Sequence, residues 1–136
     1  MRIVVTGASG FLGGAFVRQM TEARLDCIGV SRTDGLGLYR VSAYSDTPVG
    51  DCLIHCAQSN DRSRTNARGP EAEIEAHRTL SALLAKGYRH VVYASSAVLY
   101  GDGCAMPRKV TDSLKVVDGY TRIKRMSEEM VLEHGG

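Results

Sequence analysis

The chain opens with a β-branched apolar run, a glycine turn and an amphipathic segment in immediate succession. Residues 2–5, which contain the β-branched apolar run Ile3-Val4-Val5, predict a buried strand. The sequence T-G-A-S-G-F-L-G follows over residues 6–13, and Phe16, Val17 and Met20 then recur at helical spacing. A strand, a glycine turn and a helix N-terminus form the context in which dinucleotide phosphates bind. The opening stretch therefore predicts an α/β domain that begins with a phosphate-binding turn.

The glycines of this turn have separate physical roles. Gly7 lets the chain turn sharply off the strand, and Gly10 has no Cβ, so the backbone can approach a pyrophosphate closely. Gly13 lets the helix pack tightly on the strand, and the helix N-terminus offers free N–H groups and a positive dipole end. The residues expected to contact a cofactor here are Gly7, Ser9, Gly10, Phe11, Leu12 and Gly13. An ordinary glycine-rich connection remains the alternative until other motifs support the turn.

Length and composition exclude several classes of protein. The 136 residues suit one domain over residues 1–136, and the hydrophobic fraction of 43% is ordinary for a globular protein. The net charge of +2, without a basic patch interleaved with aromatics, gives no indication of nucleic acid binding. No apolar run is long enough for a membrane span, and glycines interrupt any signal-peptide core. We therefore expect a cytoplasmic protein with neither nucleic acid nor membrane as a partner.

The four cysteines are expected to be free thiols and not metal ligands. Cys52 and Cys56 fall in one predicted strand, which places both side chains on the same face, and His55 lies between them on the opposite face. Buried thiols are the ordinary state of such residues in a reducing cytosol. A zinc site would require closer pairs and further ligands, so no metal is expected.

Strands and helices alternate along the rest of the chain. Strands are predicted over residues 2–5, 26–31, 39–43, 52–56 and 90–94, helices over 11–23, 71–86 and 119–132, and loops over 58–69 and 95–117. Pro70 and Gly87 bound the middle helix as its first-turn residue and its C′ residue. This alternation implies a doubly wound parallel sheet of the Rossmann type in the order 3-2-1-4-5. The ligand is expected beyond the carboxyl ends of the first and fourth strands.

The end of the second strand bears on the choice of cofactor. It reads Ser31-Arg32-Thr33, and the nearest carboxylate, Asp34, lies further out. A hydroxyl and a planar cation suit a 2′-phosphate, which a carboxylate would repel. Ser31 and Arg32 therefore favour NADP, with NAD as the alternative. Arg32 as a solvated loop cation also remains open.

Three further segments resemble the extended short-chain dehydrogenase/reductase superfamily, of the NAD-dependent epimerase/dehydratase type. The segment S-S-A-V-L-Y-G over residues 95–101 resembles the family's S-S-x-x-V-Y-G, and Tyr120 and Lys124 form a Y-x-x-x-K pair. The segment H-C-A over residues 55–57 resembles the H-x-A ending of the family's fourth strand. The resemblance covers essentially the whole chain.

The resemblance implies a set of catalytic roles. Tyr120 would be the general acid/base, Lys124 would favour its phenolate and hold the nicotinamide ribose, and Ser96 would orient the reacting oxygen. Residues four apart on a helix share a face, which agrees with a Tyr120–Lys124 pair. Ala57 would line the cofactor site, and hydride would move between the substrate and the nicotinamide. The implied substrate is a nucleotide sugar or a similar hydroxyl or carbonyl compound.

The chain also departs from the family pattern. The third strand is short and lacks the usual following helix, which leaves Asp46 as the candidate to face the adenine. The usual active-site Asn is absent from residues 71–77. The chain stops after the Tyr/Lys helix, where extended members continue into a substrate domain, so we expect a fragment, a reduced relative or a partner-supplied pocket. Family members commonly form homodimers through the helices corresponding to 71–86 and 119–132. The rival hypothesis is a non-catalytic NADP-binding regulatory module.

Overall fold

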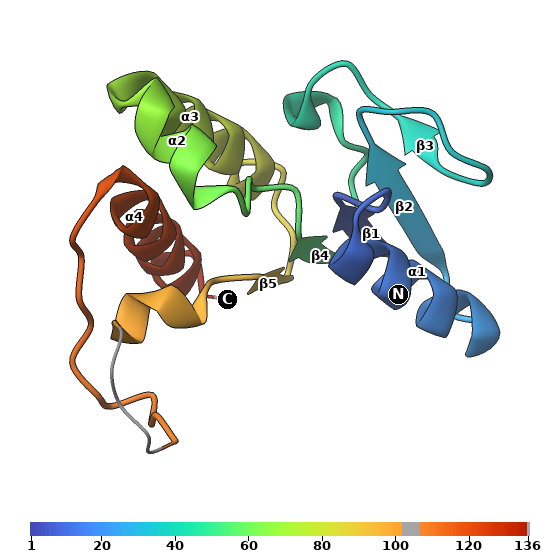
Figure 1. The fold of residues 1–136 in the computed structure, drawn as a ribbon. Coiled ribbons are helices and arrows are strands. Elements are labelled where there is room, and N and C mark those ends of the chain that lie inside the picture. Colours follow the sequence, from blue (N-terminus) through green and yellow to red (C-terminus); the bar gives the residue numbers. More distant parts are fainter. Residues whose placement is uncertain (102–106, 136) are drawn as a thin grey trace.

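A five-stranded parallel sheet forms the centre of the computed structural model, which describes residues 1–101 and 107–135 (Figure 1). Its order is β3-β2-β1-β4-β5, as predicted. Because neighbouring strands run parallel and in step, Thr6 pairs with Val30 and His55, and His55 pairs with Tyr93. The carboxyl ends therefore meet at one edge. The strands are β1 (Ile3–Thr6), β2 (Cys27–Ser31), β3 (Tyr39–Arg40), β4 (Cys52–His55) and β5 (His90–Tyr93).

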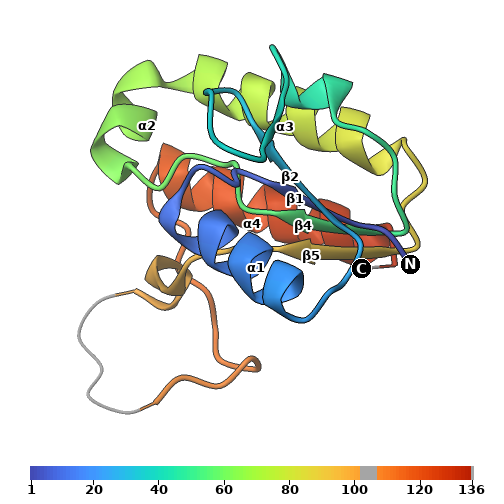
Figure 2. The same cartoon turned by 90° about the vertical axis from the view of Figure 1, so that its right-hand side faces the viewer.

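Helices pack on both faces of the sheet. The helices are α1 (Phe11–Glu22), α2 (Arg62–Arg68), α3 (Pro70–Leu84) and α4 (Gly119–Glu133), with short 3-10 turns η1 (Tyr44–Asp46) and η2 (Ala97–Tyr100). Figure 2 shows α1 on one face of the sheet and α3 on the other. Side chains of α1 pack on a small core around Val5 and Ile54. The larger core joins Val4 and Leu53 to apolar residues of α3 and α4.

The predicted polar loop over residues 58–69 was wrong in part, because α2 forms within it. The Asp61 side chain caps this helix by accepting a hydrogen bond from the Arg64 N–H at 2.9 Å. Most of α2 is polar and exposed, and only Thr65 is buried, so no apolar periodicity marked the helix. Its stability comes from its cap and from its contacts with α3 and α4.

The connection between β2 and β4 is the most reduced part of the fold. The third strand has only two residues, shorter than the predicted 39–43, and η1 is the one short turn that the structure shows between residues 41 and 51. Part of the predicted loop 95–117 forms η2, while residues 102–106 of that loop lie outside the described residues. Gly87 adopts a φ of +75° two residues after the C-cap Ala85, one position later than the predicted C′ residue. Within the described ranges, no helix is long and apolar enough to cross a bilayer.

Candidate functional site

The glycine turn after β1 lies directly against the end of β4. Gly7 has a φ of +75°, and a Cβ added there would lie 2.7 Å from the carbonyl carbon and oxygen of Cys56 and 2.9 Å from Ala57 Cα. A Cβ on Gly13 would lie 2.3 Å from the Gly7 carbonyl oxygen. Real side chains do not fit at these distances, so both positions require glycine. The turn is thereby held close to the point where β1 and β4 diverge.

The N-terminus of α1 is open to a ligand. Gly10 is its N-cap, no side chain caps the helix, and its first turn contains no acidic residue. Phe11 is 96% exposed and Leu12 is 45% exposed, so neither side chain covers this end within the described chain. The first N–H groups of a helix have no intrahelical partner and attract anions. The turn therefore fits the pyrophosphate of a dinucleotide.

The two residues at the end of β2 have different surroundings. The hydroxyl of fully buried Ser31 donates to Ser9 Oγ at 2.9 Å and accepts from the Thr33 N–H at 3.0 Å. Ser31 therefore supports the glycine turn from behind through its contact with Ser9. Arg32 is exposed and lies over the Tyr44 ring, 5.3 Å from its centroid. Asp34 is held away in an ion pair with Arg40 at 3.2 Å.

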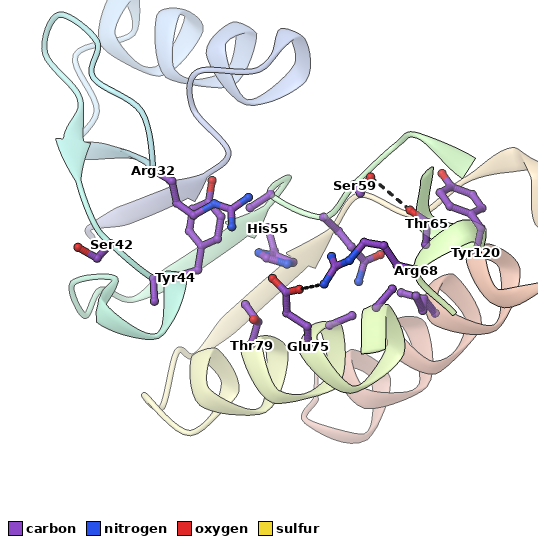
Figure 3. Close-up of a pocket in the computed structure, with 16 residues that line it drawn as sticks. Arg32, Ser42, Tyr44, His55, Ser59, Thr65, Arg68, Glu75, Thr79 and Tyr120 are labelled. Carbon is purple, nitrogen blue, oxygen red and sulfur yellow. Dashed lines mark hydrogen bonds and ion pairs between the residues drawn. The ribbon is translucent and has the colours of Figure 1, made fainter. Parts of the chain in front are cut away.

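A cavity of about 330 Å³ lies at this edge of the sheet (Figure 3). Arg32 and Tyr44 form one wall, Ala57 lies at the end of β4, and residues of α2, α3 and α4 form the opposite side. Tyr120 lines the cavity, whereas Asp46, the candidate to face an adenine, does not. The cavity lies between the two diverging halves of the sheet, where α/β folds bind ligands.

His55 forms part of the cavity lining but is almost completely buried. It is 3% exposed, and its Nδ1 lies 2.7 Å from Thr6 Oγ1. Burial, with a smaller effect of the nearby Lys124 charge, lowers the pKa of His55 from 6.5 to about 4. As predicted from strand alternation, His55 lies on the face opposite Cys52 and Cys56, both of which pack against the core on the α1 side.

This burial predicts a pH dependence of folding. The folded protein keeps His55 neutral while the unfolded chain protonates it below pH 6.5, so its contribution is complete above pH 6.5 and is lost as the pH falls toward 4. We expect a loss of about 3 kcal/mol in the free energy of unfolding over this range. Urea unfolding of wild type and His55→Asn measures it, with exposed His90→Asn as control. An unchanged pH slope in His55→Asn would contradict the expectation.

The N-terminus of α4 is fixed by a network around Asp118. The Asp118 carboxylate caps the helix through Thr121 and also accepts hydrogen bonds from Arg62 Nε at 2.6 Å and Asn66 Nδ2 at 3.0 Å. Asn66 Oδ1 in turn accepts from the Tyr120 N–H at 2.8 Å. Burial raises the pKa of Asp118, but these hydrogen bonds outweigh it and hold the pKa well below its usual range. Two residues of α2 thus position the helix that carries Tyr120.

Lys124 lies under Tyr120 in a nearly closed environment. It is 4% exposed, and its Nζ lies 5.6 Å from the Tyr120 ring centroid and 5.3 Å from that of Tyr93. Nζ also donates to the Ala94 carbonyl at 3.4 Å, which ties α4 to the end of β5. Burial lowers the pKa of Lys124 from 10.5 to about 8, against small opposing effects of Cys56 and Glu128.

Ser96 lies two residues beyond Ala94, at the start of η2. Its Oγ caps this turn by accepting from the Val98 N–H at 3.4 Å. Ser96 does not line the cavity, whereas Tyr120 does. The structure therefore brings Tyr120 and Lys124 together and places Ser96 just past the carbonyl group that Lys124 contacts.

The cysteines and acidic residues that the structure describes form no group suited to a metal ion. Cys27, Cys52 and Cys56 are free thiols, and burial raises the pKa of each. Cys104 lies outside the described residues. Among residues 1–101 and 107–135, no cluster of three or more His, Cys, Asp or Glu side chains could hold a metal ion.

Several residues of the site were missed in the sequence. The polar partners Arg62 and Asn66 lie on the unpredicted helix α2, and the Arg68–Glu75 pair in the cavity joins α2 to α3. Only Asp118 offered a sequence pattern, because an acidic residue three positions before Thr121 is typical of a helix N-cap.

The sheet order and the glycine turn define a domain with the Rossmann-type fold, a fold class whose members commonly bind dinucleotides at this edge of the sheet. The chain belongs to the NAD dependent epimerase/dehydratase family, whose model matches residues 3–136. No curated protein sequence gave a significant match.

The chain resembles solved structures described as UDP-sugar epimerases and as short-chain dehydrogenase/reductase proteins. UDP-glucose-4-epimerase from Stenotrophomonas maltophila, with bound NAD and formylated UDP-arabinopyranose, is 19% identical with a TM-score of 0.85 over 98% of this chain and 48% of that one. A short-chain dehydrogenase/reductase superfamily protein from Agrobacterium tumefaciens with bound NAD is 26% identical, with a TM-score of 0.78 over 98% of this chain and 45% of that one. The chain thus spans about half the length of these structures.

Proposed function

We propose that this chain binds a nicotinamide dinucleotide and carries the catalytic residues of an oxidoreductase or epimerase/dehydratase acting on a nucleotide sugar or a similar hydroxyl or carbonyl compound. The observation that carries the proposal is the Tyr120–Lys124 pair, with Nζ 5.6 Å from the Tyr120 ring centroid, beside a cavity at the carboxyl edge of the sheet. Solved structures of similar fold are described as UDP-sugar epimerases with bound NAD, which supports the same substrate class.

Each residue would have a distinct role in the reaction. Bound nicotinamide supplies the hydride acceptor or donor. Tyr120 would exchange a proton with the substrate oxygen, because it is the tyrosine of α4 and it lines the cavity. Lys124 would stabilise the phenolate by its charge, and its low exposure leaves that charge weakly screened by water. Ser96 would hydrogen-bond the reacting oxygen from the start of η2.

The glycine turn would hold the pyrophosphate, and the wall opposite α3 would select the cofactor. The proposed contacts of the turn are Gly7, Gly10 and Gly13 with the backbone of Ser9, Phe11 and Leu12, and Ala57 would pack against the dinucleotide. Arg32 has no carboxylate partner among the described ion pairs, so its guanidinium is available for a 2′-phosphate. We therefore propose NADP as the preferred cofactor, although similar solved structures contain NAD.

Replacing Arg32 by Ala tests the cofactor preference. We expect NADPH affinity to fall about ten-fold or more, because a charge-assisted hydrogen bond is lost, and NADH affinity to stay nearly constant. Cofactor fluorescence measures both in this chain, which contains no tryptophan. Arg40→Ala, which removes a cation already paired with Asp34, is the matched control. Equal affinity of the wild type for NADPH and NADH would overturn the preference.

Turnover separates the enzyme from a regulatory module. A nicotinamide absorbance assay with a panel of nucleotide sugars and ketones supports the enzyme if turnover depends on Tyr120. Tight dinucleotide binding without turnover of any compound supports the module. We further propose a homodimer through the outer faces of α3 and α4, where Ile74 is 57% exposed beside an open hollow that includes Met126.

A further inference from the structure

An ion pair lies inside the candidate site itself. Arg68 ends α2, and its Nη2 lies 2.5 Å from Oε2 of Glu75 in the second turn of α3. Gly69, with a φ of +58° and no atom within 4 Å of an added Cβ, forms the tight turn that brings the two helices together. Figure 3 shows both side chains extending toward His55 from the α3 side of the cavity. The pair is therefore part of the surface that a ligand must meet.

The charges around the cavity are unequal. Its described lining contains two guanidinium groups, those of Arg32 and Arg68, and one carboxylate, that of Glu75. The side chains of the pair remain 47% and 51% exposed, so water screens them and their attraction contributes little to stability. A phosphate group accepts guanidinium hydrogen bonds in the same bidentate geometry as a carboxylate, and the diphosphate of a dinucleotide bears two negative charges where Glu75 bears one. A ligand phosphate can therefore replace the Glu75 carboxylate as the partner of Arg68 at a small cost in free energy.

We propose that Glu75 occupies Arg68 in place of a ligand anion, and that a ligand phosphate displaces Glu75 and binds Arg68. The inference rests on the proposed dinucleotide function and adds to it a second phosphate contact, on the wall opposite Arg32. Glu75 would keep Arg68 oriented over the cavity in the free protein. Its negative charge would also weaken the binding of anionic ligands, so Glu75 sets how strongly phosphate-bearing compounds bind.

Two variants separate this role from a purely structural one. Glu75→Gln removes the competing charge and is expected to tighten NADPH and NADH binding about five-fold at low salt. Arg68→Gln removes the phosphate contact and is expected to weaken binding by a similar factor. Both effects should shrink as salt rises, because the groups are exposed to solvent. If the pair only joined α2 to α3, both variants would change affinity in the same direction.

The experiment measures the affinities of NADPH, NADH and UDP-glucose by calorimetry at low and high salt. Glu73→Gln is the matched control, since it removes the same charge from α3 at a residue that pairs with Arg122 outside the cavity. A change for the dinucleotides alone assigns the phosphate to the cofactor, and a change for UDP-glucose alone assigns it to the substrate. Either result supports the inference.

Two outcomes would contradict these proposals, and the experiment distinguishes them. If the wild type binds neither dinucleotide, the proposed function and the inference both fail. If it binds them and Glu75→Gln behaves like Glu73→Gln, only the inference fails. Thermal unfolding of each variant verifies that the fold is retained, as expected for substitutions of half-exposed side chains.

Discussion

Replacing Tyr120 by Phe is expected to lower turnover 10²–10⁴-fold, the range that a positioned proton donor or acceptor contributes. The variant keeps the aromatic ring, which is 5% exposed, and keeps the backbone N–H that bonds to Asn66. The fold and the dinucleotide affinity should therefore remain close to those of the wild type. Steady-state kinetics on the most active compound of the nucleotide-sugar panel, with parallel cofactor titration, measures both quantities.

Tyr100→Phe is the matched control for this prediction. Tyr100 lies in η2, four residues from Ser96, and it does not line the cavity. Removal of its hydroxyl should therefore leave the rate nearly unchanged. If Tyr120→Phe retains full turnover, or if Tyr100→Phe loses as much as Tyr120→Phe, the proton-transfer role belongs to another group.

Replacing Gly7 by Ala is expected to lower the free energy of unfolding by about 2–5 kcal/mol. Two costs combine at this position. The φ of +75° is strained for any residue with a Cβ, and that Cβ would lie 2.7 Å from the backbone of Cys56. Because the neighbour is backbone, it cannot move aside without separating β1 from β4. Urea unfolding measures the loss, and cofactor fluorescence should show that dinucleotide binding is lost with it.

Gly87→Ala measures the conformational cost alone, so the difference between the two variants gives the cost of the steric contact with Cys56. Gly87 has the same φ of +75°, but no atom lies within 4 Å of an added Cβ. This variant should therefore lose only about 1–2 kcal/mol, the cost of the left-handed conformation. Equal destabilisation by the two substitutions would show that close approach to β4 does not constrain the turn.

The regular part of the fold was predictable because its elements have strong local patterns. Buried parallel strands are continuously apolar, and the glycine turn, Pro70 and Gly87 mark where helices begin and end. The strand order followed from the right-handedness of crossovers and from the resemblance to one family. The polar helix α2 was missed, because it has no apolar periodicity and because some of the contacts that stabilise it come from residues more than 50 positions away, such as Asp118.

The candidate site likewise combines features that the sequence predicted with features that it did not. Local chemistry indicated the glycine turn and the Tyr120–Lys124 spacing, because a helix places residues four apart on one face whatever surrounds it. The hydrogen bonding of Ser31 was not predictable, since its hydroxyl donates to the side chain of Ser9, 22 residues away. Burial of Lys124 and His55 likewise depends on how α4 packs on the sheet.

The sequence by itself determined the parallel sheet, its order, the glycine turn after the first strand and the family. Each of these depends on short-range patterns of apolar residues, glycines and motif spacing. Only the tertiary structure decided which side chains face the cavity, which charges pair across it, and which titratable groups lose water. Those properties arise where α2, α3 and α4 meet the carboxyl edge of the sheet, and long-range packing sets the distances that hydrogen bonds and charges require.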